Sequence, residues 1–326
     1  MPAGRAALLV SIAAFCLLFA ALALLIYGPD IATSEAFGFA TLLAIPFAMG
    51  AIASAATDPH GIRSVTGCAF IPVGVLAGAA LIVWLVSAEG AICIAMIIPL
   101  WLPAALGGFV VNLMLRRARI RHEGKDNEWR MRSVVWAALP ALLFTTDLAA
   151  PPEWQSHEVM REILIDAPPE KIWPLLISIP DISQAEGRWT VTQDVLGVPR
   201  PSEARLVRRN GGLVRLAGWG EDIRFEEQVT AIVPGRAIAW RFAFPDDSVQ
   251  RHTDRHVAPD GEILRIESGR YELSHGGDGK TTLRLVTRYG SRVRLDGYFA
   301  LWGDRMLGDV EANVLEIVRQ RAEAQH

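Results

Sequence analysis

Glu227 is an acidic residue at a position where the surrounding pattern predicts apolar side chains. The stretch IRFEEQVTAIVPGRAIAWRF (223–242) has the composition of two β-strands joined by a Pro-Gly turn. Because side chains alternate along a strand, Phe225, Glu227, Val229 and Ala231 should share one face. All except Glu227 are apolar, so we expect that face to be the covered one.

A carboxylate on a covered face must be hydrogen-bonded, paired, protonated or hydrated, because an isolated buried charge is strongly unfavourable. Glu227 therefore has two interpretations. In the first, it is the polar contact of an otherwise apolar pocket, where it fixes a ligand hydroxyl or amine. In the second, it pairs with an arginine such as Arg215, or lies at the hydrated end of the sheet. The sequence leaves both open.

The HTDRH segment has residue types that bind metals. His252, Asp254 and His256 share one face if this segment is extended, and such a set is sufficient for zinc or non-haem iron. Prolines, aspartates and a glycine on either side indicate an exposed connection between strands. We therefore assign no metal site.

Motifs for nucleophilic, phosphate-binding or dinucleotide chemistry are absent from the sequence. General acid–base catalysis would fall to Glu227, Tyr271, Tyr289 or Arg270. No spacing among these four requires catalysis, so we assign no catalytic residue and no cofactor.

The second half of the chain has the pattern of an antiparallel meander. A short helix with proline at its start follows the first strand, at 168–178. The turn signals are Asn-Gly-Gly, Pro-Gly, Pro-Asp-Gly and Gly-Gly-Asp-Gly. The predicted strands are 158–167, 203–217, 222–233, 236–244, 261–273 and 280–294.

The chain closes with a predicted long amphipathic helix at 298–324. Its apolar residues recur at spacings of three and four, which places them on one stripe. We place Glu311 on the opposite, polar face. The predicted stripe consists of Phe299, Trp302, Met306, Val310, Val314, Ile317 and Arg321.

The order of these segments resembles a known family. ILIDAPPEKIWPLL, GVPRP, FEEQVTAIVPGRAIAW, GRYEL, TTLRLVTRY and YFALWGD…LEIVRQRAE follow one another as in the SRPBCC, or START-like helix-grip, superfamily of polyketide cyclase/dehydrase and lipid transport proteins. The resemblance covers about residues 157–324. It implies an α+β fold in which a curved antiparallel sheet wraps a long C-terminal helix and leaves a hollow for an apolar or amphipathic molecule.

The same resemblance implies which residues line that hollow, although each one singly also fits ordinary core packing. The expected lining consists of Trp173, Phe225, Glu227, Val229, Trp240, Phe242, Tyr271, Leu283, Leu285, Tyr289, Trp302 and Met306.

The first half of the chain has a different composition. Long apolar runs concentrate in residues 1–150, which predicts a transmembrane helical domain ahead of a helix-grip domain at 155–326. About five spans are expected, at 6–27, 36–57, 68–87, 90–115 and, more weakly, 133–150. All three cysteines, Cys16, Cys68 and Cys93, lie in this half, so a disulfide framework in the second half is excluded.

The basic residues of the short loops predict the orientation in an inner or plasma membrane. The 116–132 loop carries seven Lys and Arg residues, which places it and the N-terminus on the cytoplasmic side. Five spans put the second half in the periplasm or outside the cell. If 133–150 does not span, that half is cytoplasmic.

The preferred function is a membrane-anchored binding module for a lipid or other hydrophobic small molecule. Membrane lipids are expected partners, and no basic face indicates nucleic acid. The alternatives are a cyclase/dehydrase-type enzyme acting on an apolar substrate, and a transporter or signalling unit with the second half as its ligand sensor.

Overall fold

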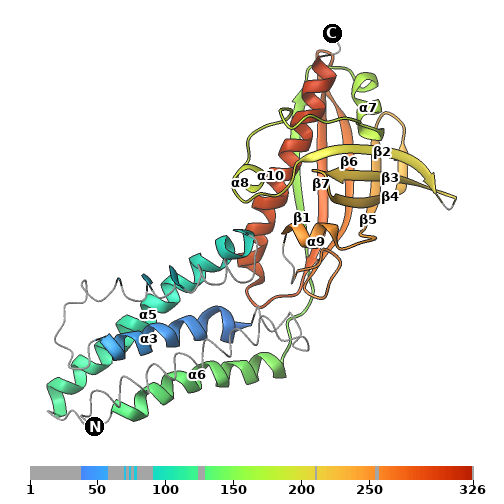
Figure 1. Ribbon diagram of the computed structural model, residues 1–326. Coiled ribbons are helices and arrows are strands. Elements are labelled where there is room, and N and C mark those ends of the chain that lie inside the picture. Colours follow the sequence, from blue (N-terminus) through green and yellow to red (C-terminus); the bar gives the residue numbers. More distant parts are fainter. Residues whose placement is uncertain are drawn as a thin grey trace. The chain divides into compact units, whose positions relative to one another are not determined.

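The structure, a computed structural model, describes residues 38–57, 70, 73–74, 77–78, 91–123, 129–209, 211–253 and 257–324. The chain divides into two compact units (Figure 1). One contains most residues up to Pro152, and the other contains Glu153–Arg292 and Asp296–His326.

The N-terminal unit is helical where it is described. Its elements are the π-helix η1 (Ala40–Ala44), α3 (Ile45–Thr57), α5 (Ala91–Glu123) and α6 (Trp129–Ala149). Gly50 of α3 and Gly108 of α5 allow close crossing: a Cβ on Gly50 would lie 1.8 Å from the Ala105 carbonyl oxygen. Asn112, inside α5, donates to Ser54 Oγ at 3.2 Å and accepts from Trp136 Nε1 at 3.1 Å. Side-chain hydrogen bonds thus join three helices.

The expected number of spans is not reproduced. Among the described residues, α5 alone contains a segment long and apolar enough to cross a bilayer, Ile94–Ala118. The apolar parts of the 36–57 and 133–150 predictions are shorter, at Ala40–Ala55 and Ala138–Ala149. The predicted span 6–27 and most of 68–87 lie outside the described residues.

The C-terminal unit has the predicted α+β helix-grip fold. Its sheet is antiparallel and seven-stranded, in the order β1-β7-β6-β5-β4-β3-β2. The strands are β1 (Gln155–Ile165), β2 (Pro201–Arg209), β3 (Gly212–Trp219), β4 (Ile223–Val233), β5 (Ala237–Ala243), β6 (Leu264–Gly277) and β7 (Lys280–Ser291). The predicted strand 203–217 is in fact the hairpin of β2 and β3, which turns at the Asn-Gly-Gly signal.

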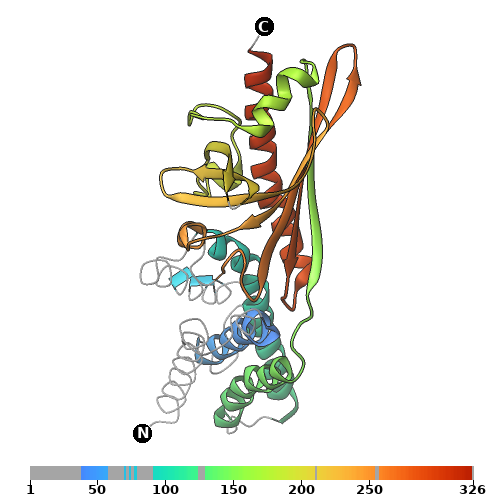
Figure 2. The same ribbon diagram turned by 90° about the vertical axis from the view of Figure 1, so that its right-hand side faces the viewer.

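The helices of this unit are α7 (Pro169–Ile177), α8 (Val191–Asp194), α9 (Ser248–Thr253) and α10 (Asp296–Glu323). The sheet curves around α10, which lies along its inner face against β1 and β7 (Figure 2). Between them is a core that includes Ile165, Ile172, Leu176, Ile238 and Leu315, each buried almost completely. Full burial of each such side chain is worth about 1.5–3 kcal/mol.

Strand β4 departs from simple alternation at one point. Val229 pairs with Trp240, but the next pair is Ala231 with Ala239, so Thr230 forms a β-bulge. As a result Ile232, opposite the fully buried Ile238, joins the inner face, and Ala231 leaves it. The prediction that Ala231 shares the face of Glu227 was therefore wrong, because a one-residue bulge reverses the alternation beyond it.

The buried stripe of α10 is also rotated from the predicted one. Ile317 belongs to both. Gly308, Glu311, Leu315, Val318 and Ala322 are buried, whereas Trp302 and Met306 are half-buried. Glycine and alanine occupy part of the contact face because their small size allows close approach, and Glu311 lies there as well. A pattern based on large apolar residues does not detect these three residue types.

Candidate ligand-binding site

Glu227 lies on the inner face of the sheet, as predicted, and it has a cationic partner there. Arg215 of β3 is its register neighbour, and Arg215 Nη1 donates to Glu227 Oε2. Both side chains are buried, with residue exposures of 5% and 6%. The arginine pairing proposed for Glu227 is therefore confirmed.

Tyr271 of β6 completes this polar group. It is 3% exposed, and the Arg215 guanidinium carbon lies 5.7 Å from its ring centroid. The Trp240 ring lies beside it, with centroids 5.1 Å apart. Three strands thus place a cation, a carboxylate and a phenol within an aromatic part of the core.

Burial governs the ionisation of these groups. It raises the pKa of Glu227, and the neighbouring Arg215 opposes that rise only in part. Burial would lower the pKa of Arg215, but Glu227 and Tyr271 outweigh it, so Arg215 stays charged. Burial also raises the pKa of Tyr271 to about 12. Tyr271 is therefore a neutral phenol at physiological pH.

Several buried polar atoms near this group lack partners. In the part of the chain that the structure describes, Arg215 Nε, Trp240 Nε1 and both carboxylate oxygens of Glu311 make no hydrogen bond of regular geometry. Arg215 and Trp240 lie on the inner face, and Glu311 projects from the contact side of α10. A buried polar atom without a partner costs about 1–3 kcal/mol, so each needs a ligand, a water molecule or a functional reason.

The remaining predicted lining residues are distributed over the same interior. Leu283 and Leu285 belong to the main core cluster with Trp240 and Tyr271, and Trp173, Val229 and Phe242 pack against it. Phe225 belongs to a second cluster with Ala217 and Ile223. Tyr289 lies beside His157 with ring centroids 5.0 Å apart and the ring planes tilted by 30°, and burial raises the pKa of Tyr289 to about 12.

A hollow of about 280 Å³ lies on the other face of the sheet, above β4 to β7. The register places Ala239, Arg241 and Arg270 on that outer face, opposite to Tyr271. The predicted hollow between sheet and helix therefore stays a prediction. The lining of the outer hollow consists of Thr230, Ala239, Trp240, Arg241, Ser268, Gly269, Arg270, Val286 and Arg288.

Two other sequence candidates lie away from the interior. Arg270 is on the outer face, where its Nε is 2.8 Å from Glu272 Oε1, so it is not available for acid–base chemistry beside Tyr271. His252 lies in α9, while Asp254 and His256 fall outside the described residues. Across the described residues, no group of three or more metal-ligating side chains is suited to hold a metal.

Glu311 is the buried acidic residue that the sequence prediction missed. It was placed on the polar face of the final helix, yet it is 2% exposed. Its spacing from Gly308, Leu315, Val318 and Ala322 matches one helical stripe, and this spacing was the available signal.

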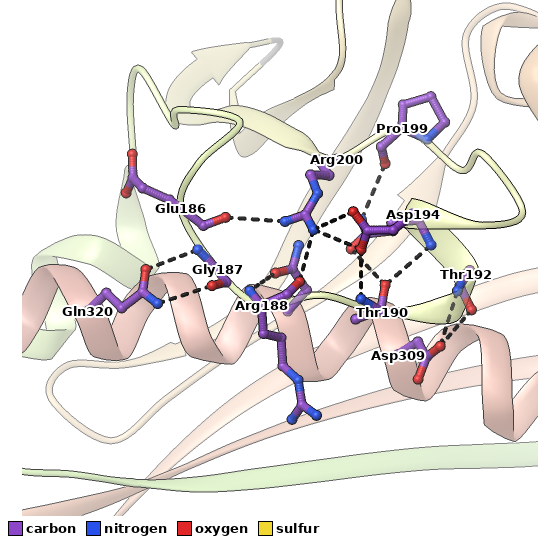
Figure 3. Close-up of polar contacts among 12 residues, drawn as sticks. Glu186, Gly187, Arg188, Thr190, Thr192, Asp194, Pro199, Arg200, Asp309 and Gln320 are labelled. Atoms are coloured by element: carbon purple, nitrogen blue, oxygen red, sulfur yellow. Dashed lines mark hydrogen bonds and ion pairs between the residues drawn. The ribbon is translucent and has the colours of Figure 1, made fainter.

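The segment between α7 and β2, residues 178–200, is held along α10 by polar contacts (Figure 3). Arg200 Nη2 lies 2.9 Å from both carboxylate oxygens of Asp194 and donates to the Arg188 carbonyl at 3.0 Å. Arg200 Nη1 donates to the Glu186 carbonyl at 3.2 Å. One guanidinium therefore links Glu186, Arg188 and Asp194 of this segment.

Helix α10 supplies the other half of these contacts. Gln320 accepts from the Gly187 amide at 2.9 Å and donates to the Gly187 carbonyl at 3.1 Å. Asp309 accepts from the Thr192 amide and hydroxyl at 3.2 and 3.0 Å. Gln320 and Asp309 thus satisfy backbone groups of Gly187 and Thr192 and hold the segment against α10.

The chain is structurally similar to several solved proteins. The Zhui aromatase/cyclase from Streptomyces sp. R1128 aligns with 16% identity over 52% of this chain and 96% of its own, at a TM-score of 0.34. Norcoclaurine synthase from Thalictrum flavum aligns with 11% identity over 53% and 89%, at a TM-score of 0.34. Ara h 8.0201 aligns with 14% identity over 52% and 99%, at a TM-score of 0.31.

No family model matches this chain, and no curated protein matches it. The helix-grip arrangement is established by the sheet order and by the packing of α10.

Proposed function

We propose that the C-terminal unit binds a hydrophobic, amphipathic small molecule between the inner face of the sheet and α10. Arg215 and Tyr271 would contact its polar end, and the aromatic residues around Trp240 would contact its apolar part. The observation that carries this proposal is the set of buried polar atoms that the described chain leaves without hydrogen-bond partners. Binding sites for small molecules combine an apolar lining with a few such polar groups.

A purely structural role for the Arg215–Glu227 pair explains less of what is observed. A buried ion pair contributes little net stability compared with apolar residues of similar size. Its guanidinium also has five donors, and Nε has no partner among the described residues. A ligand oxygen that accepts from Nε would account for this unsatisfied donor.

Native mass spectrometry of the full-length chain purified from a cell extract tests the proposal. We expect a bound hydrophobic compound, and we expect its removal to speed amide hydrogen exchange in β3, β4 and β6. Arg215→Gln should lower its retention at least about tenfold, because one lost charged hydrogen bond is worth about 1.5–3 kcal/mol. Arg209→Gln, at an exposed position on β2, is the matched control.

A chain without any bound compound, whose interior exchange is unaffected by hydrophobic additives, would contradict the proposal. If amide hydrogen exchange in the helices and in the edge strands β1 and β2 is unchanged in Arg215→Gln, the variant is folded. Equal retention by both variants would refute the role of Arg215 specifically.

We further propose that residues 1–150 anchor this unit, 155–326, to a membrane. Support comes from the apolar segment Ile94–Ala118 and from the arginine-rich sequence that begins at its end. The charge asymmetry favours a cytoplasmic 116–132 loop and a C-terminal unit in the periplasm or outside the cell. A C-terminal reporter that is active only outside the cytoplasm should give signal. A signal from a cytoplasm-only reporter would place the unit on the other side.

A further inference from the structure

Glu311 is a buried carboxylate in the middle of the contact face of α10. It projects toward the sheet near Thr287 of β7 and is 2% exposed. Neither of its oxygens makes a hydrogen bond of regular geometry within the described ranges, although Thr287 lies close enough to lower its pKa through hydrogen bonding. A carboxylate in this position is costly unless it is protonated or meets a partner.

Trp240 brings a second unsatisfied group into the same region. Its indole lies over Gly269: a Cβ there would be 2.5 Å from two ring carbons and 2.8 Å from Nε1. Gly269 is the register partner of Thr287, the residue that Glu311 faces. The Trp240 indole N–H and the Glu311 carboxylate therefore lie above adjacent positions on the inner face of the sheet, but they do not hydrogen-bond to each other.

The charged side chains around Glu311 already pair with other groups. Arg161 of β1 makes hydrogen bonds of 3.1 Å to both carboxylate oxygens of Asp304 and of 3.0 Å to its carbonyl. Arg215 pairs with Glu227, and Tyr271, which interacts electrostatically with Glu311, is a neutral phenol. An ionised Glu311 thus lacks a cation of its own among these described neighbours.

The ionisation of Glu311 reflects this environment. Burial raises its pKa to about 8, against the opposing effects of Thr287 and Arg161, and Asp304 raises it further. The group therefore changes charge near physiological pH.

We propose that Glu311 binds the ammonium group of a hydrophobic amine, with the Trp240 indole beside it. This assignment rests on the proposed function, because it places one end of the interior ligand. An ammonium supplies the missing positive charge and N–H donors, whereas a carboxylate would add a second negative charge. The indole face attracts a cation as well, and its Nε1–H remains to donate to an oxygen of the same ligand.

Isothermal titration calorimetry with three probes of equal chain length tests this proposal. The full-length chain, kept soluble in an amphipathic polymer, is titrated with n-octylamine, 1-octanol and octanoate. We expect octylamine to bind at least about tenfold more tightly than octanol, as a charged hydrogen bond predicts. Octanoate should bind more weakly than octylamine, because its carboxylate cannot pair with Glu311.

The affinity for octylamine should also depend on pH. An alkylammonium titrates like a lysine, near about 10.4, so it stays charged while Glu311 loses its proton. If the amine binds only the ionised form, its affinity rises on the order of fifty-fold from about pH 6 to about pH 8. Titrations in buffers of different ionisation enthalpy should show that a proton is released on binding at the acid end.

Glu311→Gln should remove the preference for the amine and its pH dependence, while octanol binds as before. Glu316→Gln is the matched control, since Glu316 lies on the same helix and pairs with Arg319 at 2.6 Å. Hydrogen exchange of α10 verifies that both variants are folded. Equal binding of octanol and octylamine by the unmodified chain would overturn this inference alone. Absence of binding by all three probes would overturn the proposed function with it.

Discussion

Removing one partner of the Arg215–Glu227 pair should have different consequences depending on which partner is removed. Glu227→Gln leaves a guanidinium that is 5% exposed and cannot lose its proton. An uncompensated charge in such a site costs about 3–5 kcal/mol. Arg215→Met leaves a carboxylate that can become neutral, and burial already raises its pKa. We therefore expect the Arg215→Met variant to be the less destabilised of the two.

The pH dependence of Arg215→Met follows from the same reasoning. Without the arginine, the folded-state pKa of Glu227 rises further above its unfolded value of 4.5. A raised carboxyl pKa means that the folded state binds more protons, so stability is greatest below the unfolded pKa and is lost as the pH rises toward the folded pKa. The destabilisation should shrink at acid pH. In Glu227→Gln it should not, because Arg215 remains charged.

Amide hydrogen exchange of peptides from β3 and β4 in the full-length chain measures these effects as free energies of local opening. The double variant Arg215→Met/Glu227→Leu should be more stable than Glu227→Gln, because no buried charge remains. If the cost of the double variant equals the sum of the two single costs within about 0.5 kcal/mol, the pair is not coupled. That additivity would refute the burial argument.

Two further predictions concern the same interior. Gly269→Ala should destabilise β5 and β6 by about 1–3 kcal/mol, because its Cβ would lie 2.5 Å from the Trp240 ring. Gly297→Ala is the control, since a Cβ at Gly297 meets nothing within 4 Å. Equal rates of amide hydrogen exchange in the two variants would contradict close packing of Trp240 on Gly269. For Glu311, a pKa raised from 4.5 to about 8 predicts that stability falls by up to about 5 kcal/mol as the pH rises across that interval, at about 1.4 kcal/mol per unit. Glu311→Gln should abolish that fall in stability, which is measured by amide hydrogen exchange of α10. A pH profile that is the same in the variant and the unmodified chain would show that Glu311 is hydrated in the folded protein.

The sequence predicted the architecture of the C-terminal unit well, because alternation, turn residues and helical spacing are local properties. It predicted the inward direction of Glu227 from its strand neighbours, and named Arg215 as a possible partner. It did not predict the bulge at Thr230, since no turn residue or break in polarity marks it. It also missed the burial of Glu311, since a glutamate on an amphipathic helix ordinarily faces water.

By itself, then, the amino-acid sequence determined the order of strands and helices, the apolar character of the first half and the presence of a charged residue on a covered strand face. The tertiary structure decided which polar groups meet. Arg215, Glu227 and Tyr271 come from three strands and Glu311 from the final helix, and only the curvature of the sheet around α10 brings them into one interior. Pairing and desolvation depend on distances between segments remote in the chain, and no local pattern contains those distances.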